Sequence, residues 1–281
     1  MKRMSIAAVA ALLLTALGLG GMYWYQQRAR MAAEKNATAT AQAEAPAEPA
    51  SAAASVPAIR NPIDPSLATA SAPTTGDPQA LWRQGLVELL GQSAVVRFVQ
   101  TDDFSRRLVV TVDNLGRAHA APRLWPVNPT PGRFNVTGNG ELRNIAAENA
   151  GRYTPLVTMI TAVDARQAAA LYVRMYPQLQ KAYEELGYPG RYFNDRVVEV
   201  IDHLLETPEP TAAGPLVQLT EVKGSVPSTQ PWLRYEFADT DLQSLSSGQR
   251  ILLRVGPAHR QALKAKLAEL RKLLARAPVS R

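Results

Sequence analysis

The chain has 281 residues, of which 46% are apolar and 20% are charged, and its formal net charge is +7. This length and composition suit one or two globular domains. Because the chain contains no cysteine, it cannot form disulfides, use a thiol nucleophile or carry a lipid-modified N-terminal cysteine.

The first predicted element is a membrane-spanning helix from Ile6 to Tyr25, a run of twenty residues without a charge. At about 1.5 Å per residue, this length matches the ~30 Å hydrocarbon core of a bilayer. A cleaved signal peptide is the alternative, but the bulky Tyr23, Trp24 and Tyr25 stand where a cleavage site needs small residues. We therefore interpret the segment as an uncleaved signal anchor, with the aromatic residues at the membrane interface.

The orientation of this anchor rests on its flanks. Basic residues are almost equally frequent on the two sides, so the positive-inside rule gives nearly a tie. The short tail of residues 1–5 resembles the cytoplasmic tail of ordinary signal anchors. Residues 26–77 are rich in Ala and Pro, as are many periplasmic spacers, and such a composition buries too little apolar surface to fold. We expect a disordered linker there and a folded domain in the periplasm.

The remaining residues, 78–281, predict a mainly α, compact multi-helix domain with a small β-hairpin. A helix is expected from Pro78 to Leu90, and another from Phe104 to Leu115, each followed by a glycine. From His119 to Gly140 the chain is rich in Pro and Gly, which predicts an irregular arm with a short strand at Phe134 to Val136.

The central stretch, Asn149 to Glu209, has the densest helical periodicity. A helix should begin after a cap at Asp164, and Pro177 inside it predicts either a kink or two helices. A second helix is expected from a cap at Asn194 to Glu206, ended by Thr207 and Pro208. The apolar positions of the first helix recur at three- and four-residue steps: Ala168, Leu171, Tyr172, Met175, Leu179, Tyr183 and Leu186.

Further along, alternating residues predict a hairpin of Leu216 to Val222 with Trp232 to Phe237, and a helix follows from Leu242 to Val255. Pro257 begins a last helix. From Arg260 to the end there are seven Lys or Arg and one Glu. We favour an arrangement in which its leucines dock on the core and its basic residues face water. The alternative is a basic surface that binds anionic lipid or nucleic acid.

Several segments resemble one bacterial family, known as domain of unknown function 3014, in the same order along the chain. They are NAGRYTPLV, YPQLQKAYEELGYP, FNDRVVEVIDHLLETPEP and YEFADTDLQSLSSGQRILLRVGP. The resemblance covers Asp77 to Leu274 and departs at His259, where the family more often has Asn. It implies no reaction, ligand or catalytic residue.

A search for catalytic and metal-binding patterns gives no assignment. There is no nucleophile elbow, phosphate-binding loop or HExxH motif. Ser244, Ser246 and Ser247 near a helix start are interpreted as caps, as is Asp239 in the Asp239-Thr240-Asp241 run. The histidines His119, His203 and His259 are isolated in sequence, and Asp202, His203 and Glu206 are interpreted as surface residues rather than metal ligands.

Carboxylates and tyrosines are the remaining candidates. Asp164, Glu184, Glu185 and Asp202 are the carboxylates considered for acid–base catalysis, but adjacent Glu184 and Glu185 point about 100° apart on a helix. Tyr172, Tyr176 and Tyr183 form one stripe, with Tyr153, Tyr188 and Tyr192 nearby. They line either the rim of the core, which we favour, or a groove for a peptide or glycan. Arg152, Arg174 and Asp164 are expected to pair with one another or with these hydroxyls.

The sequence therefore predicts a single-pass inner-membrane protein that acts as a non-catalytic interaction or scaffold module of the bacterial cell envelope. No catalytic, cofactor-binding or metal-binding residue is assigned, and no cofactor is expected. The predicted partners are the inner membrane, through Ile6 to Tyr25, and an envelope protein or cell-wall polymer, whereas nucleic acid is not favoured. The alternatives are an envelope hydrolase or transferase acting on cell-wall polymer, and a binder of anionic lipid or nucleic acid through the basic C-terminal helix.

Overall fold

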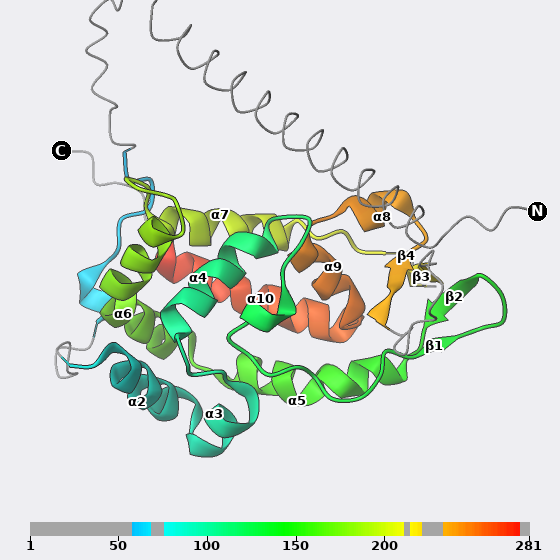
Figure 1. Ribbon diagram of the computed structural model, residues 1–281, viewed down its shortest axis with the longest axis horizontal. Helices are drawn as coiled ribbons and strands as arrows, with labels where there is room; N and C mark the ends of the chain where they lie inside the picture. The colour runs from blue at the N-terminus through cyan, green and yellow to red at the C-terminus, as the bar shows by residue number, and fades with distance from the viewer. Residues whose placement is uncertain (1–57, 69–75, 211–213, 221–232, 276–281) are drawn as a thin grey trace, which may run out of the picture. The chain divides into compact units, whose positions relative to one another are not determined.

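The computed structural model describes residues 58–68, 76–210, 214–220 and 233–275, all in the second of two compact units, which runs from Val56 to Arg281 (Figure 1). This unit is mainly helical with a small antiparallel sheet, which confirms the predicted class of the folded domain. The predicted anchor, Ile6 to Tyr25, lies outside the described residues. Within the described ranges, no helix has the length and apolar character to cross a membrane.

The helices bring distant parts of the sequence together. α10 contacts α5, α6, α7 and α9, and α4 contacts α6, α7 and α9. In Figure 1, α10 lies between α5 and α7. The described helices and 3-10 turns are η1 (Pro65–Leu67), α2 (Pro78–Leu90), α3 (Gln92–Phe98), α4 (Phe104–Leu115), η2 (Pro122–Leu124), α5 (Glu148–Ala162), α6 (Ala165–Glu185), α7 (Phe193–Leu205), α8 (Thr240–Ser244), α9 (Ser247–Arg254) and α10 (Pro257–Leu274).

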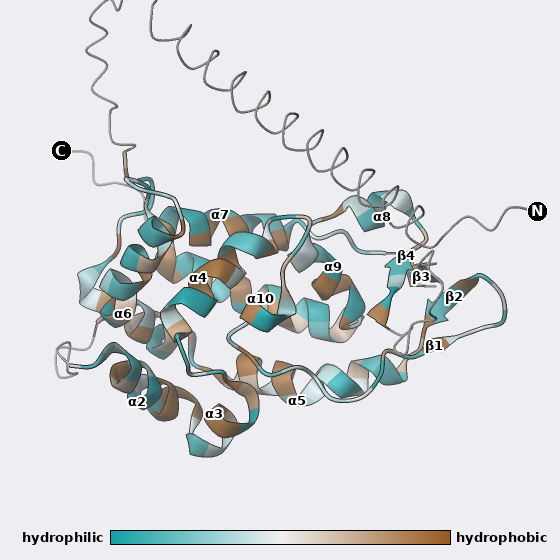
Figure 2. Cartoon of the chain, in the orientation of Figure 1, coloured by the Kyte–Doolittle hydropathy of each residue, from teal (hydrophilic) through white to brown (hydrophobic). Residues whose placement is uncertain are grey.

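The core forms where the apolar stripes of these helices meet. Figure 2 shows hydrophobic and hydrophilic residues alternating along α4 and α7, as expected of helices with one buried face. Val109, Leu179 and Phe193 are fully buried at the centre. Burying each such side chain contributes about 1.5–3 kcal/mol to folding. The predicted face of α6 is confirmed at Leu171, Met175, Leu179 and Tyr183, all of which are buried.

α6 begins where the sequence predicts. The Asp164 carboxylate accepts the backbone N–H of Gln167 at 2.8 Å, which caps the helix. Of the two outcomes predicted for Pro177, division into two helices is wrong, because α6 continues through it as a single element. The residues that follow it, Leu179 and Tyr183, are held in the core, and this packing offsets the missing backbone hydrogen bond.

The sheet is larger than the predicted hairpin. Its strands, all antiparallel, lie in the order β1-β2-β3-β4, so the predicted pairing of the last two is confirmed. Val217 on β3 lies opposite Phe237 on β4, and both pack on Leu253 of α9. The sequence patterns did not indicate that β2 joins this sheet. The strands are β1 (Val136–Thr137), β2 (Leu142–Ile145), β3 (Leu216–Leu219) and β4 (Tyr235–Phe237).

The predicted helix from Leu242 to Val255 is wrong in one respect, because it is divided into α8 and α9. The break lies at Leu245 and Ser246. The Ser246 hydroxyl accepts the N–H of Gln249 at 3.2 Å, and the Gln249 side chain accepts the N–H of Ser246, which forms a capping box. A capping box favours a new helix start over continuation of the preceding helix.

Residues 58–68, which the sequence places in the linker, pack against the folded unit; we call them the strap. The backbone N–H groups of Arg60 and Asn61 both donate to the buried Asp195 carboxylate, at 3.1 and 2.7 Å. Leu67 packs against the core. The linker prediction therefore fails for the strap, because its backbone donors, rather than an apolar pattern, hold it in place. The rest of the predicted linker, apart from residues 76 and 77, lies outside the described residues.

Asn194 does not cap α7 as predicted; the residue at that position is Tyr192. The Asn194 side chain instead donates to the carbonyls of Asn61, at 2.9 Å, and Leu274, at 3.0 Å. It also accepts the hydroxyl hydrogen of Tyr172. One fully buried amide thus joins the strap, the end of α10 and α6.

Candidate binding site

The residues that the sequence offered as nucleophiles or metal–nucleotide ligands serve as helix caps or tethers. The predictions for Ser246 and Asp239 are confirmed, since Asp239 accepts backbone N–H groups at the start of α8. The hydroxyl of Ser244 donates to a carbonyl within its own helix, and that of Ser247 donates to the Asn114 carbonyl at 2.8 Å. None of these hydroxyls is paired with a histidine base in the described residues.

The three histidines lie apart from one another. His119 is exposed, whereas the ring of His259 bonds the Thr154 hydroxyl and the Val255 carbonyl, at 3.2 and 3.0 Å. His203 is half-buried, and its Nε2 has no hydrogen-bond partner. In the part of the chain that the structure describes, no group of three or more His, Asp or Glu is arranged to hold a metal ion.

In the described part of the chain, a hollow of about 390 Å³ beside α7 and the strap is lined by several carboxylates. Asp195 binds the backbone of the strap, and Glu199 accepts from Arg196 at 2.6 Å. Asp202 pairs with Arg271, whose Nη2 lies 2.9 Å from one carboxylate oxygen. These three carboxylates are therefore engaged by cations or N–H groups, whereas the fourth, Glu206, is exposed and its side chain has no partner among the described residues. The other carboxylates that the sequence offered, Glu184 and Glu185, are exposed on α6.

The tyrosine stripe of α6 lies at the edge of the core. Tyr172 donates to Asn194 at 3.1 Å, and Tyr176 donates to Gln180 at 3.0 Å. Burial raises the pKa of Tyr176 to about 12, and it raises the pKa of Tyr172 well above its usual value. The ring of Tyr183 stacks on Tyr188 with centroids 4.5 Å apart. These contacts fit the interpretation of the stripe as a core rim.

The predicted pairing of Arg152, Arg174 and Asp164 is wrong. Arg152 donates to the carbonyls of Pro131 and Gly132, and Arg174 lies 3.7 Å from Glu88 on α2. Both arginines therefore fasten neighbouring segments to the helices that carry them. The sequence could not indicate these partners, because each is separated from its arginine by a loop or by several helices.

Several basic residues of α10 are engaged within the fold, contrary to the prediction that they face water, whereas Lys272 is exposed as predicted. Arg260 is 4% exposed and its Nε donates to Glu209 at 2.9 Å, while Lys264 donates to the Thr207 carbonyl at 3.0 Å. The hydrogen bond from Arg260 lowers the pKa of the Glu209 carboxyl. Lys266 donates to the Val163 carbonyl, at 3.0 Å. The described part of this helix therefore uses much of its charge within the fold.

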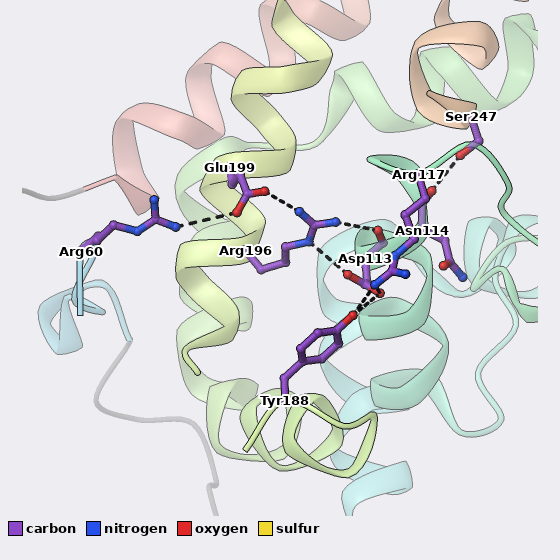
Figure 3. Close-up of polar contacts among 8 residues, drawn as sticks. All are labelled: Arg60, Asp113, Asn114, Arg117, Tyr188, Arg196, Glu199 and Ser247. Atoms are coloured by element: carbon purple, nitrogen blue, oxygen red, sulfur yellow. Dashed lines mark hydrogen bonds and ion pairs between the residues drawn. The ribbon is translucent and has the colours of Figure 1, made fainter. Parts of the chain in front are cut away.

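The densest polar network lies between α4 and α7 and is drawn in Figure 3. The buried Asp113 carboxylate lies 2.8 Å from Arg117 and 3.1 Å from Arg196, and it accepts the Tyr188 hydroxyl hydrogen at 3.1 Å. Arg196 continues to Glu199, which lies 3.7 Å from Arg60 of the strap. We call these residues the Asp113 network. It joins four segments, and every charge in it has an opposite partner.

A different arrangement lies between α9, β4 and residues 118–125, around a cavity of about 680 Å³. We call it the arginine pocket. Its residues come from segments far apart in sequence, and those used below are His119, Trp125, Arg234, Glu236, Arg250 and Arg254.

The start of α9 is fixed against the end of α4, and this contact positions the arginine pocket. The Ser247 N–H donates to the Arg117 carbonyl at 2.7 Å. Gly248 permits the close approach, since a Cβ there would lie 2.5 Å from Leu204 Cδ2 and 2.9 Å from the Leu115 carbonyl oxygen. Arg250 and Arg254 follow on α9, one helical turn apart, so they project to the same side.

The two arginines of α9 are held by carbonyl oxygens and aromatic rings. Arg250 donates to the Gln243 carbonyl at 2.8 Å and to the Ala118 carbonyl. Arg254 donates to the Tyr235 carbonyl at 2.6 Å, and its guanidinium carbon lies 5.3 Å from the Phe237 ring centroid. Burial, and then the charge of Arg250, lower the pKa of Arg254. In the described residues neither arginine forms an ion pair with a carboxylate.

Sequence reasoning did not select the arginine pocket. Arg250 and Arg254 were visible as a four-residue step within the helix, but so were many other charged pairs. What distinguishes them is that no described carboxylate pairs with them. This depends on which side chains β4 and residues 118–125 place beside the two arginines. Trp125 was hidden in a segment predicted as irregular. No local signal in the sequence identifies this site.

The fold and the pocket define a class: a mainly helical domain with a four-stranded antiparallel sheet and a basic cavity at their junction. The model of the family described as protein of unknown function (DUF3014) matches residues 104–271, more than half of the chain. The chain therefore belongs to this family, as its motifs predicted. The matched region includes all residues of the arginine pocket and excludes the strap. No curated protein and no solved structure was found to be similar.

Proposed function

We propose that this protein is a non-catalytic, membrane-anchored interaction module of the bacterial cell envelope, and that it binds its partner at the arginine pocket. The observation that carries the proposal is a contrast in how side chains are used. The residues suited to catalysis are largely engaged in caps and ion pairs, whereas buried donors of the arginine pocket lack acceptors. These donor atoms are themselves buried, and the residues that carry them line a cavity, which supports a binding site there.

The proposed anchor is Ile6 to Tyr25, with residues 1–5 in the cytoplasm, an Ala- and Pro-rich linker from residue 26, and the folded unit in the periplasm. This part of the proposal rests on the length and apolar character of that segment. Reporters fused after Arg281 test it: one that is active only outside the cytoplasm should be active, and one that is active only inside should be silent. The reverse pattern contradicts the periplasmic location.

Two alternatives receive less support. An envelope hydrolase or transferase needs carboxylates free to act as acid and base, but Asp195, Glu199 and Asp202 in the acidic hollow are engaged, which leaves Glu206 alone there. A binder of anionic lipid or nucleic acid through the C-terminal helix needs free cations, but Arg260 is buried against Glu209. We therefore favour the arginine pocket as the binding site.

Site-specific photocrosslinking in intact cells tests the proposed site. A photoreactive benzoylphenylalanine replaces His119, an exposed residue at the pocket, and, as a matched control, Glu185, an exposed residue of α6. We expect a discrete crosslinked product from position 119 and none from position 185. Equal products from both positions, or no product from position 119 when the protein is folded and inserted, contradict the proposed function.

A further inference from the structure

The arginine pocket gathers hydrogen-bond donors that the fold leaves without acceptors. In the described residues, four buried side-chain polar atoms lack a partner, and three of them belong to residues that line this pocket: Trp125 Nε1, Thr220 Oγ1 and Arg254 Nε. Indole and guanidinium N–H groups donate and do not accept. A buried donor without an acceptor loses its hydration with no compensation. The site is therefore short of acceptors.

The pocket also concentrates positive charge. Three arginines line it, Arg234, Arg250 and Arg254, and among the described residues that line it only Glu236 carries a carboxylate. Glu236 forms no ion pair with these arginines within the described structure. An excess of two positive charges at a partly buried site favours a bound anion, because the anion neutralises the repulsion between the guanidinium groups.

The donors are held in place before a ligand arrives. The Tyr235 carbonyl and the rings of Phe134 and Phe237 fix the Arg254 guanidinium, and the Gln243 carbonyl fixes Arg250. Because their side-chain freedom is already restricted, binding an anion costs little ordering entropy. Guanidinium groups match the planar, multiple acceptors of a phosphate or carboxylate.

Part of the pocket wall is apolar. Ala121, Pro122 and Ile251 line it beside the indole of Trp125. A volume of about 680 Å³ lies within the roughly 300–1,000 Å³ typical of small-molecule sites. A free inorganic anion would leave this wall unused, whereas a molecule with an anionic head and an apolar body would cover it.

We propose that the arginine pocket binds a small amphiphilic anion, whose phosphate or carboxylate group is held by Arg250 and Arg254 and whose apolar body packs against Pro122 and Ile251. The inference rests on the proposed function, because it names the ligand class of the same site. It is independent of whether the ligand is free or forms the end of a larger envelope molecule.

Calorimetric titration of the full chain in nanodiscs of zwitterionic lipid tests the ligand class. Four probes separate head from body: phenyl phosphate and benzoate carry both, inorganic phosphate carries only the head, and phenol carries only the body. We expect phenyl phosphate or benzoate to bind at least tenfold more tightly than inorganic phosphate and phenol. A preference for phenyl phosphate indicates a phosphate ester as the natural ligand, and a preference for benzoate indicates a carboxylate.

Three variants locate the binding. Arg254→Gln removes a charge from the pocket and should weaken binding of the preferred probe about tenfold or more. Arg234→Gln serves if that variant fails to fold, since the side chain of Arg234 forms no hydrogen bond or ion pair with a described residue. Trp125→Phe keeps an aromatic ring but removes the pyrrole half of the indole together with its N–H. We expect about threefold to tenfold weakening for each. Arg83→Gln, on an exposed turn of α2, is the matched control and should leave affinity unchanged.

The outcomes separate the ligand class from the proposed function. The inference is overturned if neither phenyl phosphate nor benzoate binds, if inorganic phosphate binds equally tightly, or if binding is unaffected by the pocket variants. If these results accompany a discrete crosslink from position 119, the proposed function stands and only the ligand class fails. If the crosslink is absent as well, both fail.

Discussion

The Asp113 network and the arginine pocket each contain three arginines, and they differ in what faces those arginines. In the Asp113 network, one buried carboxylate receives Arg117 and Arg196. In the arginine pocket, carbonyl oxygens and aromatic rings receive Arg250 and Arg254, and no carboxylate of the described residues forms an ion pair with them. The same residue type therefore joins helices in one place and presents charge to a cavity in the other.

The difference has an energetic meaning. Breaking a buried ion pair leaves a charge without its partner and is strongly destabilising. Removing a buried charge that has no carboxylate partner also removes the cost of its desolvation, so the net loss in the free energy of unfolding is small. Substitutions in the Asp113 network should therefore destabilise the protein more than substitutions in the arginine pocket. The largest expected effect comes first below.

Asp113→Ala should reduce the free energy of unfolding by about 3–5 kcal/mol, because Arg196 loses its buried carboxylate partner and keeps only the more exposed Glu199, and the Tyr188 hydroxyl loses its acceptor. Urea unfolding of the full chain in detergent measures this loss. Glu185→Ala is the control, since its pair with Lys181 is exposed and should contribute less than about 0.5 kcal/mol. Similar losses from the two variants would contradict a structural role for the Asp113 network.

Asn194→Ala should cost about 2–3 kcal/mol, because the carbonyls of Asn61 and Leu274 lose their donor and Tyr172 loses its acceptor. Hydrogen exchange should also become faster in the strap, whose N–H groups bind the neighbouring Asp195. Unchanged exchange at Arg60 and Asn61 would show that the strap is held without Asn194. The arginine pocket shares no residue with this contact, so affinity for an anionic probe should be retained.

Tyr176 provides a test by pH. Its pKa is raised from 10.0 to about 12, chiefly by burial, so the folded protein keeps this proton in a range where the unfolded chain releases it. The stability contribution is therefore complete below pH 10 and is lost as the pH rises towards 12. Because the ring is partly exposed, the expected loss is on the order of 1 kcal/mol. The free energy of unfolding is measured at pH 10 and near pH 12 for the unmodified protein and for Tyr176→Phe. The variant should lack the part of the pH-dependent loss that Tyr176 causes.

Arg254→Met should change the free energy of unfolding by less than about 1 kcal/mol. The substitution gives up a hydrogen bond to Tyr235 and the stacking on Phe237, but it also removes a desolvated charge. The same urea experiment as for Asp113→Ala measures the change. A loss as large as that of Asp113→Ala would mean that Arg254 is structural, and it would remove the contrast between the two regions.

Much of the helical fold could be predicted because its signals are local. The caps at Asp164 and Ser246, and the glycines after α2 and α4, act within a few residues, and the structure uses them. Predictions failed where the decisive partner is distant. Asn194 has the composition of a cap, but its side chain binds Asn61 and Leu274, which no local pattern relates to it.

The candidate site failed to appear in the sequence for the same reason. Whether an arginine is neutralised depends on the carboxylates that the fold places beside it. Arg260 and Arg254 look alike in sequence, yet one binds Glu209 and the other lines a cavity. The excess positive charge of the last helix pointed to its own arginines as a basic binding surface. Arg260 is instead paired with Glu209, just after α7, which lies beside it only in the folded chain.

The strap described above also sets where a mechanical load enters the folded unit. A pull on the chain that precedes it reaches Asp195 and Asn194, at the first turn of α7, before it reaches α2. Through Asn194, the same load is shared with the last carbonyl of α10. Single-molecule pulling from the N-terminus should therefore show a small early extension, when the strap detaches, before the helical core unfolds. An expressed fragment that begins at Pro78 would lack this event.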